Sequence, residues 1–363
     1  MAITLTSLDP GAFDAFDEVI DARAPAEYAE DHIPGAVNLP VLDDAERARV
    51  GTIYTQQSPF EARRIGAALV ARNVARHLER HFAARGRDYR PLVYCWRGGQ
   101  RSGAFATILG QVGWRPETLE GGYRSWRRLV KHALYDRPMA APVVVLDGDT
   151  GTAKTGLLAR MAARGVQVID LEALAGHRGS LFGTLPGGQP AQKGFETALA
   201  RRLAGLDPAQ PVVVEAESSR IGALNLPPAL WRAMRDAPRL TVTAPLNARA
   251  RYLVRAYPEL VADRAMLRQR LDRLRPFHAR VRIEHWQALA EDGAMEALAR
   301  ELMLHHYDPR YARARSAAGE LLRLDLPSLE PDALEDAAAR LARHVSAGPA
   351  DRSGAGTRSN DRA

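Results

Sequence analysis

The feature that most constrains this chain is an apolar strand that runs directly into a glycine-rich turn and then into a helix. Val143 to Leu146 are followed by Gly148-Asp149-Thr150-Gly151-Thr152-Ala153-Lys154-Thr155 and by helix-forming residues up to Met161. This order is typical of a P-loop, whose backbone N–H groups cradle phosphates while the lysine neutralises them and the threonine ligates Mg²⁺. We therefore expect a diphosphate-binding loop formed by Gly148, Gly151, Thr152, Lys154 and Thr155.

One position departs from the P-loop pattern, because Ala153 stands where the motif has glycine. If the backbone there needs a positive φ or a close approach to phosphate, the Cβ would weaken binding. Against this, the chain has only three lysines, at Lys131, Lys154 and Lys193, and one of them occupies the phosphate-binding position. A degenerate structural turn remains the alternative to a working anion site.

Further apolar runs alternate with helical stretches, at Val166 to Asp170, Pro211 to Ser218 and Leu240 to Thr243. The alternation indicates a parallel sheet covered on both faces, with ligands at the carboxyl ends of its strands. Five residues near such ends are candidates for holding Mg²⁺ or substrate: Asp170, Glu215, Glu217, His177 and Arg178. For each of them, capping a helix, pairing with an opposite charge or fixing a loop is an equally good interpretation.

The single cysteine, Cys95, follows a second apolar run and begins the segment Cys95-Trp96-Arg97-Gly98-Gly99-Gln100-Arg101-Ser102. N–H groups of such a loop and of the following helix favour negative charge, which lowers a thiol pKa, and only the thiolate is a nucleophile. We expect Cys95 to be catalytic in a loop that binds an anion through Arg97, Gly98, Gly99, Arg101 and Ser102. The alternative is a buried structural cysteine.

Composition sets wider limits on the chain. Its 363 residues suffice for about two domains. The net charge of +7 suggests an anionic partner, although the excess is almost wholly arginine and is weak evidence for RNA. One cysteine excludes a disulfide framework or a Cys-rich metal site, and we expect no structural metal. No signal peptide or membrane span is visible, so we expect a cytoplasmic protein with no membrane partner.

The stretch from Asn247 to Trp286 predicts helices dense in arginine with aromatic residues interleaved, a pattern suited to RNA. A solvated face is an equally good account. The candidates for RNA contact are Arg249, Arg251, Arg255, Arg273 and Arg275. The segment from Ala347 to Ala363 is rich in Gly, Ser, Arg and Asp, and we expect it to be disordered.

Three N-terminal features together resemble a rhodanese domain: the stretch from Asp21 to Pro40, the Cys95 loop and the turn Glu120-Gly121-Gly122-Tyr123. Most rhodaneses have four residues between the cysteine and the arginine, whereas Cys95 and Arg101 enclose five, as in phosphatases of this fold. With the P-loop, the segment from Asp170 to Gly183 and the segment from Glu215 to Gly222, nearly the whole chain resembles bacterial tRNA 2-selenouridine synthases.

That resemblance implies replacement of sulfur by selenium at the 2-thiouridine of the tRNA wobble position. The implied substrates are selenophosphate and geranyl diphosphate, with an S-geranylated uridine as intermediate. We expect no tightly bound cofactor, with Mg²⁺ as a candidate ion. tRNA is the expected partner, and a selenophosphate-supplying enzyme is a candidate partner; the sequence does not fix the oligomeric state.

The expected fold class is α/β, with a rhodanese-like domain at residues 1–133, a linker at 134–142 and a P-loop NTPase-like parallel-sheet domain with an arginine-rich helical extension at 143–346. Two other functions stay open. One is a sulfurtransferase or phosphatase of the rhodanese fold fused to a nucleotide-binding domain. The other is a non-catalytic RNA-binding protein.

Overall fold

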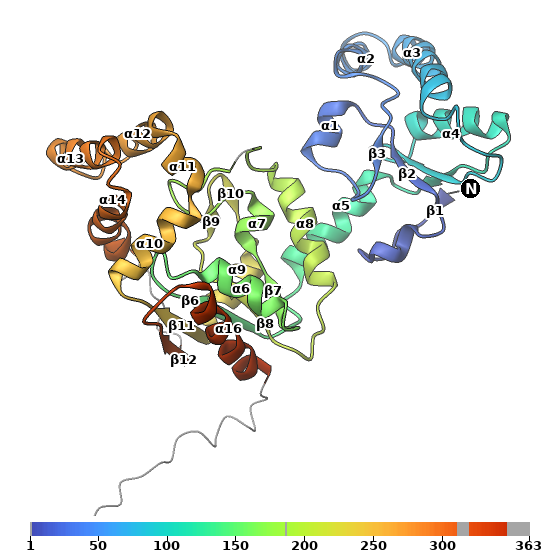
Figure 1. Cartoon of the computed structure of the whole chain (residues 1–363). Coiled ribbons are helices and arrows are strands. Elements are labelled where there is room, and N and C mark those ends of the chain that lie inside the picture. Colours follow the sequence, from blue (N-terminus) through green and yellow to red (C-terminus); the bar gives the residue numbers. More distant parts are fainter. Residues whose placement is uncertain (1, 186, 311–318, 347–363) are drawn as a thin grey trace, which may run out of the picture. The chain divides into compact units, whose positions relative to one another are not determined.

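The computed structural model describes residues 2–185, 187–310 and 319–346, which form two compact units (Figure 1). Unit 1 consists of Met1–Arg137 and Pro190–Gly205, and unit 2 of Pro138–Gln189 and Leu206–Ala363. Each unit contains a five-stranded parallel sheet with helices around it. The predicted α/β fold class is confirmed.

The sheet of unit 1 has the strand order β1-β5-β4-β2-β3. Its central strand, β4, is fully buried, which agrees with its apolar sequence, because a parallel strand covered on both faces is apolar throughout. The strand leads directly into the Cys95 loop. The elements are β1 (Ala2–Ile3), η1 (Pro10–Phe13), β2 (Glu18–Asp21), α1 (Pro25–Glu30), β3 (Val37–Asn38), α2 (Asp44–Gln56), α3 (Pro59–Arg80), β4 (Pro91–Tyr94), α4 (Gln100–Val112), β5 (Glu117–Leu119), α5 (Tyr123–Lys131) and η2 (His132–Asp136).

One helix of unit 1 comes from a distant part of the chain. Helix α8 (Gln192–Ala204) follows α7 (Leu171–Ala175) of unit 2 in sequence, yet it packs against α5, η2 and α1. Thr197 Oγ1 donates to buried Asp31 and accepts from Trp126 Nε1, and buried Glu196 pairs with Arg127. The predicted division placed residues 190–205 with the second domain, whereas the structure assigns them to unit 1. Their polar partners are far away in the sequence, so no local pattern reveals the assignment.

The predicted linker at residues 134–142 is also shorter in the structure. Residues of η2 continue α5 directly, and Leu134 is fully buried in unit 1. At the other end, Ala141 is buried immediately before the first strand of unit 2. The connection therefore reduces to a few residues around Arg137 and Pro138.

The sheet of unit 2 has the order β12-β11-β6-β8-β7, with β6 in the centre. Helices α6 and α16 pack together on this sheet through a shared apolar core. The sheet elements and their helices are β6 (Val143–Asp147), α6 (Lys154–Ala162), β7 (Gln167–Ile169), α7 (Leu171–Ala175), β8 (Val212–Glu215), β9 (Arg220–Ile221), β10 (Leu224–Asn225), α9 (Pro228–Asp236), β11 (Arg239–Thr243), β12 (Glu320–Asp325) and α16 (Pro331–Ser346).

The predicted helical extension forms a lobe with its own apolar core, which includes fully buried Trp286 and Leu271. We call these helices the helical lobe; in Figure 1 they are orange to red and follow β11. They are α10 (Leu246–Ala256), α11 (Pro258–Ala262), α12 (Arg264–Asp272), α13 (Arg280–Glu291), α14 (Met295–Leu302) and η3 (Met303–Tyr307).

Among the helices of the described ranges, none has both the length and the apolar content that crossing a bilayer requires. The C-terminal segment predicted to be disordered lies outside the described residues.

Candidate functional site

Cys95 lies at the end of β4 and is 3 % exposed, with its thiol next to the first turn of α4. Burial by itself raises the pKa of this thiol. It is outweighed by hydrogen bonds from the Ser102 hydroxyl and N–H, by the positive charge of Arg101 and by the Gly99 N–H, so that the pKa is lowered overall. The Ser102 Oγ to Cys95 Sγ distance is 3.2 Å. The loop therefore favours the thiolate, which is the nucleophilic form.

Two glycine turns hold this loop against the start of α5. A Cβ on Gly122 would collide with the Cys95 carbonyl and the Gly98 N–H, and a Cβ on Gly98 would collide with the Leu119 carbonyl. Both glycines have φ near +60°, a conformation that other residues rarely adopt. In addition, the Tyr123 N–H donates to the Cys95 carbonyl at 2.8 Å. The loop is thus fixed by backbone contacts that leave no room for a side chain at Gly98 or Gly122.

The two arginines of the loop lie in different surroundings. Arg101 is largely buried and pairs with Glu27 at 2.7 Å, which lowers the Glu27 pKa against the opposing effect of burial. Arg97 is exposed. Both belong to the loop that begins at Cys95, and Arg101 contributes positive charge at the thiol. Of the two, Arg101 is thus the one whose charge acts on the thiol.

In unit 2, the predicted P-loop joins β6 to α6. Ala153 has φ 62° and ψ 27° at the N-cap of α6, and it is the one non-glycine residue with positive φ in the described part of the chain. A left-handed conformation costs an ordinary residue roughly 1–2 kcal/mol, which explains why glycine is standard there. Here the loop keeps its shape with alanine, and the Ala153 methyl group is buried in the core of unit 2.

Lys154 and Thr155 begin α6 beneath this loop. Lys154 Nζ donates to the carbonyl oxygens of Gly148 and Asp149, at 2.8 Å and 3.3 Å, so its charge lies across the turn that would surround a phosphate. Thr155 Oγ1 lies 3.0 Å from a Glu215 oxygen and 3.2 Å from a Glu172 oxygen, and its one proton is donated to one of them at a time. The hydroxyl is therefore directed toward two carboxylates at the carboxyl ends of β8 and β7.

Glu172, Glu215 and Glu217 form an acidic cluster at this end of the sheet. Burial raises the pKa of each of the three, and repulsion from neighbouring carboxylates raises it further, while the charge of Lys154 lowers it. Sequence reasoning missed Glu172, which lies in the first turn of α7. The available signal for Glu172 was its position two residues after Asp170, at the end of a predicted strand.

The cluster fits a magnesium ion whose coordination is completed by the oxygens of a bound diphosphate. Glu215 Oε1 is buried without a hydrogen-bond partner among the described atoms, and its other oxygen accepts from Thr155. No group of three or more His, Cys, Asp or Glu side chains in the described ranges could hold a metal by itself. Mg²⁺ usually takes one or two carboxylates plus substrate phosphates, so Thr155 and Glu215 would hold it only together with a ligand.

The remaining three candidates near the strand ends have structural contacts. Asp170 caps α7 by accepting from the Ala173 N–H at 2.8 Å. His177 is buried and forms a β-bridge with Thr184, and burial lowers its pKa. Arg178 pairs with Glu259 and lies 4.5 Å from the centre of the Tyr257 ring. These contacts shape α7 and the loop between α7 and α8.

Of the five arginines predicted to contact tRNA, Arg249 is the exception. It is 6 % exposed, forms two hydrogen bonds with Asp308 and donates to the Thr150 carbonyl of the P-loop at 3.1 Å. Its burial removes it from any RNA-facing surface, because the guanidinium is needed to join the P-loop to the helical lobe.

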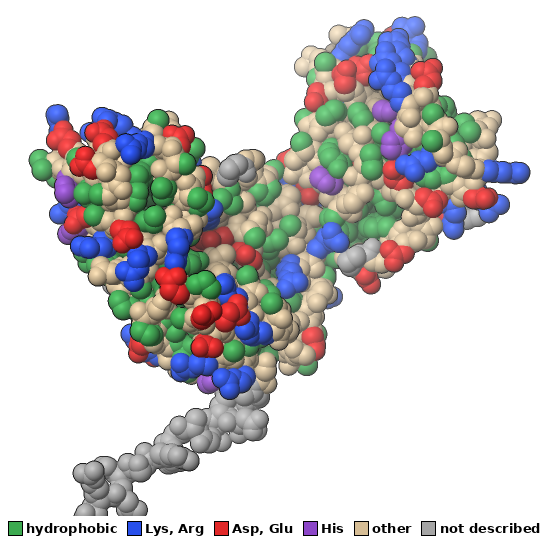
Figure 2. Space-filling model, in the orientation of Figure 1, with side chains coloured by type: hydrophobic (Ala, Val, Ile, Leu, Met, Phe, Trp, Pro, Cys, Tyr) green, Lys and Arg blue, Asp and Glu red, His purple; other side chains and the backbone are tan. Residues whose placement is uncertain are grey.

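The other four, Arg251, Arg255, Arg273 and Arg275, are exposed. Arg255 pairs with Glu330, and Arg275 with Asp272. Figure 2 shows Asp and Glu side chains mixed with Lys and Arg over the visible face of the helical lobe, without a continuous basic area. The arginine density of the sequence is therefore partly balanced by neighbouring acids.

Two protein families match this chain. A family described as the tRNA 2-selenouridine synthase AAA domain matches residues 141–287, and the rhodanese-like domain family matches residues 8–129. The chain is 36 % identical over 323 residues to the tRNA 2-selenouridine synthase of Chromohalobacter salexigens, covering 81 % of this chain and 86 % of that protein. The chain belongs to the tRNA 2-selenouridine synthase family.

Other members of this family give the same extent of match. The tRNA 2-selenouridine synthase of Alcanivorax borkumensis is 33 % identical, over 81 % of this chain and 88 % of that protein. The one from Pseudomonas syringae pv. syringae is 32 % identical, over 82 % of this chain and 88 % of that protein. The similarity thus spans both units.

Proposed function

We propose that this member of the tRNA 2-selenouridine synthase family converts the wobble 2-thiouridine of tRNA to 2-selenouridine in two steps, using geranyl diphosphate and then selenophosphate. The observation that supports two steps is the presence of two anion sites with different chemistry. One is a loop that favours the Cys95 thiolate, and the other is a P-loop with Lys154 and Thr155 beside an acidic cluster. tRNA and a selenophosphate-supplying enzyme are the proposed partners, in the cytoplasm.

The first step would take place at the P-loop. The thiocarbonyl sulfur attacks C1 of geranyl diphosphate, the C–O bond breaks, pyrophosphate leaves with the electron pair, and the uridine loses its N3 proton. Backbone N–H groups of the loop and Lys154 stabilise the charge that develops on the pyrophosphate. Mg²⁺, when held by Thr155, Glu215 and the diphosphate, supplies further neutralisation of that charge.

The second step would take place at the Cys95 loop. The selenium of selenophosphate attacks C2 of the uridine and geranyl thiolate leaves, a better leaving group than the sulfur of a thiocarbonyl. The Cys95 thiolate then attacks phosphorus: an S–P bond forms and the Se–P bond breaks. Selenium keeps the electron pair in 2-selenouridine, and water cleaves the cysteinyl phosphate to free phosphate. A perselenide on Cys95 would instead need a two-electron oxidant, which neither substrate supplies.

The test is the nucleoside content of tRNA after incubation with geranyl diphosphate and selenophosphate, separately and together, measured by mass spectrometry. Cys95→Ala should abolish 2-selenouridine and still form S-geranyl-2-thiouridine. Lys154→Ala should slow geranyl transfer, yet allow selenation of tRNA that already carries the geranyl group. If folded Cys95→Ala protein loses both products, the division of labour between the two sites is wrong.

One observation favours a second candidate function. The five-residue spacing from Cys95 to Arg101, with the Ser102 hydroxyl on the thiol, also suits a phosphatase of the rhodanese fold. Release of phosphate from a simple aryl phosphate in the absence of tRNA would support that function. Phosphate release only from selenophosphate in the presence of geranylated tRNA would support the synthase mechanism.

A further inference from the structure

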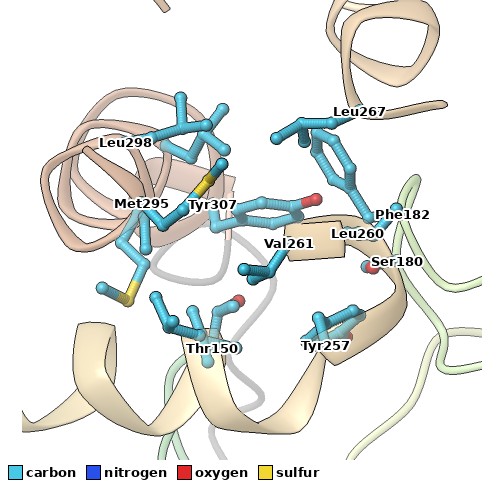
Figure 3. Close-up of a pocket in the computed structure, with 15 residues that line it drawn as sticks. Thr150, Ser180, Phe182, Tyr257, Leu260, Val261, Leu267, Met295, Leu298 and Tyr307 are labelled. Atoms are coloured by element: carbon cyan, nitrogen blue, oxygen red, sulfur yellow. The ribbon is translucent and has the colours of Figure 1, made fainter. Parts of the chain in front are cut away.

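An apolar pocket opens beside the P-loop within unit 2 (Figure 3). Its walls come from the helical lobe and from the loop between α7 and α8, and Thr150 brings the P-loop itself into the wall. The space between the lining side chains is about 610 Å³, counting the part open to solvent. The residues that carry the argument are Thr150, Ser180, Leu253, Tyr257, Met295 and Ala299.

The walls of this pocket exclude most polar ligands. Of the fifteen lining residues, only Thr150, Ser180, Tyr257 and Tyr307 have an oxygen in the side chain, and none of the fifteen is charged or carries an amide. In Figure 3, hydrocarbon side chains from α14 on one side and α11 and α12 on the other face each other across the space. A nucleobase and ribose would leave several polar groups without side-chain partners there. A hydrocarbon chain would leave none.

One edge of the pocket is the phosphate-binding loop. A Cβ on Gly151 would lie 3.0 Å from Leu253 Cγ, so the P-loop backbone is in direct contact with the pocket wall. Arg249 fixes this edge, because it holds the Thr150 carbonyl and, through Asp308, the end of η3. A ligand whose head lies on the P-loop therefore has the pocket directly next to it.

A second edge of the pocket adjoins the acidic cluster. Ser180 lines the pocket, and its neighbour Gly179 lies so close to Glu217 that a Cβ there would be 2.6 Å from the carboxylate. The pair of Arg178 with Glu259, together with its position over the Tyr257 ring, attaches this loop to α10 and α11. The pocket is thus bounded by both elements that would bind a magnesium diphosphate.

We propose that this pocket holds the hydrocarbon chain of the allylic diphosphate whose head lies on the P-loop, and that Ala299 and Met295 of α14 set the chain length it accepts. The inference rests on the function proposed above and adds the site of the chain. Ala299 has the smallest side chain of the lining, so enlarging it fills space that the ligand would otherwise occupy. Met295 is among the longest, so its truncation adds space.

The experiment compares Ala299→Phe with Ala297→Phe in the full-length protein. Both alanines are half-buried on α14, and only Ala299 lines the pocket. Calorimetric titrations would use dimethylallyl, geranyl and farnesyl diphosphates, with inorganic pyrophosphate as the probe for the head site alone. We expect Ala299→Phe to weaken geranyl diphosphate binding by about tenfold or more, since a single methylene is worth about that factor in a filled pocket.

The pattern across ligands distinguishes the pocket from a general loss of folding. Ala299→Phe should bind pyrophosphate like the wild type and should lose less affinity for the five-carbon chain than for the ten-carbon chain. Ala297→Phe should leave all affinities unchanged. Met295→Ala should raise the affinity for farnesyl diphosphate relative to geranyl diphosphate.

Two outcomes overturn the inference in distinguishable ways. If the wild type binds and transfers geranyl but Ala299→Phe and Met295→Ala leave the chain-length preference unchanged, the pocket assignment is wrong and the proposed function stands. If the wild type does not bind geranyl diphosphate at all, both fail. If binding depends on Ala299 and Met295 but no geranyl reaches tRNA, the pocket assignment stands and the first step of the proposed function fails.

Discussion

Opposing effects act on the pKa of the Cys95 thiol, and they differ in how easily a substitution can remove them. Burial cannot be changed without disturbing the core, whereas the Ser102 hydroxyl is a single donor at 3.2 Å from the sulfur. Because hydrogen bonds to the charged form stabilise it, loss of this hydroxyl should act on the thiol, and its other contact is the Gly99 carbonyl at 3.3 Å. The other effects that lower the thiol pKa are backbone N–H groups and the charge of Arg101, which also pairs with Glu27.

Ser102→Ala should therefore raise the pKa of Cys95. The thiolate is present above its pKa and is lost as the pH falls, so the acid limb of selenation should move to higher pH in the variant. The measurement is the pH dependence of single-turnover selenation of tRNA that already carries S-geranyl-2-thiouridine. Thr107→Val is the control, because that hydroxyl on the same helix bonds only the Gly103 carbonyl at 2.9 Å. An unchanged acid limb in Ser102→Ala would show that the hydroxyl does not tune the thiol.

Ala153 and Arg249 show which features of the site could not be predicted from the sequence. The exception at Ala153 was visible as a missing glycine, but its φ of 62° depends on how β6 and α6 are joined, which no local pattern encodes. Arg249 shows the opposite case: composition made it one of many surface arginines, and its burial follows from Asp308, fifty-nine residues away. Residue types at the site were predictable, whereas the partners that decide their roles were not.

At the scale of elements, the Cys95 loop depends on the turn that precedes α5. Gly122→Ala should cost about 2 kcal/mol or more in unfolding free energy, since the new methyl meets the Cys95 carbonyl and the φ of 58° is unfavourable for alanine. Selenation should be lost even where the protein remains folded, and geranyl transfer should be retained. Urea unfolding and nucleoside analysis measure these effects.

Gly103→Ala is the matched control for that change. Gly103 lies within α4, and a Cβ there would have no neighbour within 4 Å. Alanine in a helix interior is favoured over glycine by roughly 1 kcal/mol, so this variant should be as stable as the wild type or more stable, and fully active. Equal damage from both substitutions would mean that the turn does not support the loop.

The arginines of the helical lobe divide into two classes that experiment can separate. Arg249→Met should lower stability by about 2 kcal/mol, because it leaves Asp308 and the Thr150 carbonyl without their partner. Its tRNA affinity, measured on the folded protein, should be unchanged. Arg273→Ser, at an exposed position, should weaken tRNA binding and reduce the salt dependence of log Kd by about one unit. Reversed results would place Arg249 at the RNA surface after all.

Most strands could be predicted from local pattern, because buried parallel strands are short apolar runs bounded by turns. Strands β4, β6, β8 and β11 and the helices after β4 and β6 were identified in this way. Strand β12 was not, although it completes the sheet beside β11. Its sequence, Glu320 to Asp325, mixes charged residues with leucines and is a weak strand signal by itself, and its partner lies about eighty residues earlier in the chain.

At the scale of the whole molecule, the placement of α8 determines which segments of the chain form an independently folding unit. We compare a protein comprising residues 1–137 with the same segment joined through a flexible linker to residues 190–205. The free energy of unfolding of the shorter protein should be lower by about 3–5 kcal/mol, because Asp31, Arg127 and Trp126 lose their partners on α8. Urea unfolding compares the two. Trp126 is 1 % exposed, so its fluorescence should shift to longer wavelength in the shorter protein. Equal stability would show that α8 is dispensable to unit 1.

This arrangement also fixes the order in which the protein can mature on the ribosome. Domains usually fold one after another as the chain emerges. Here the first 137 residues emerge without the helix that covers Trp126 and satisfies Asp31. By the time residue 205 has been synthesised, β6, the P-loop and β7 have already been synthesised. The selenium-transfer unit thus reaches its final form only after synthesis of the diphosphate-binding unit is well advanced.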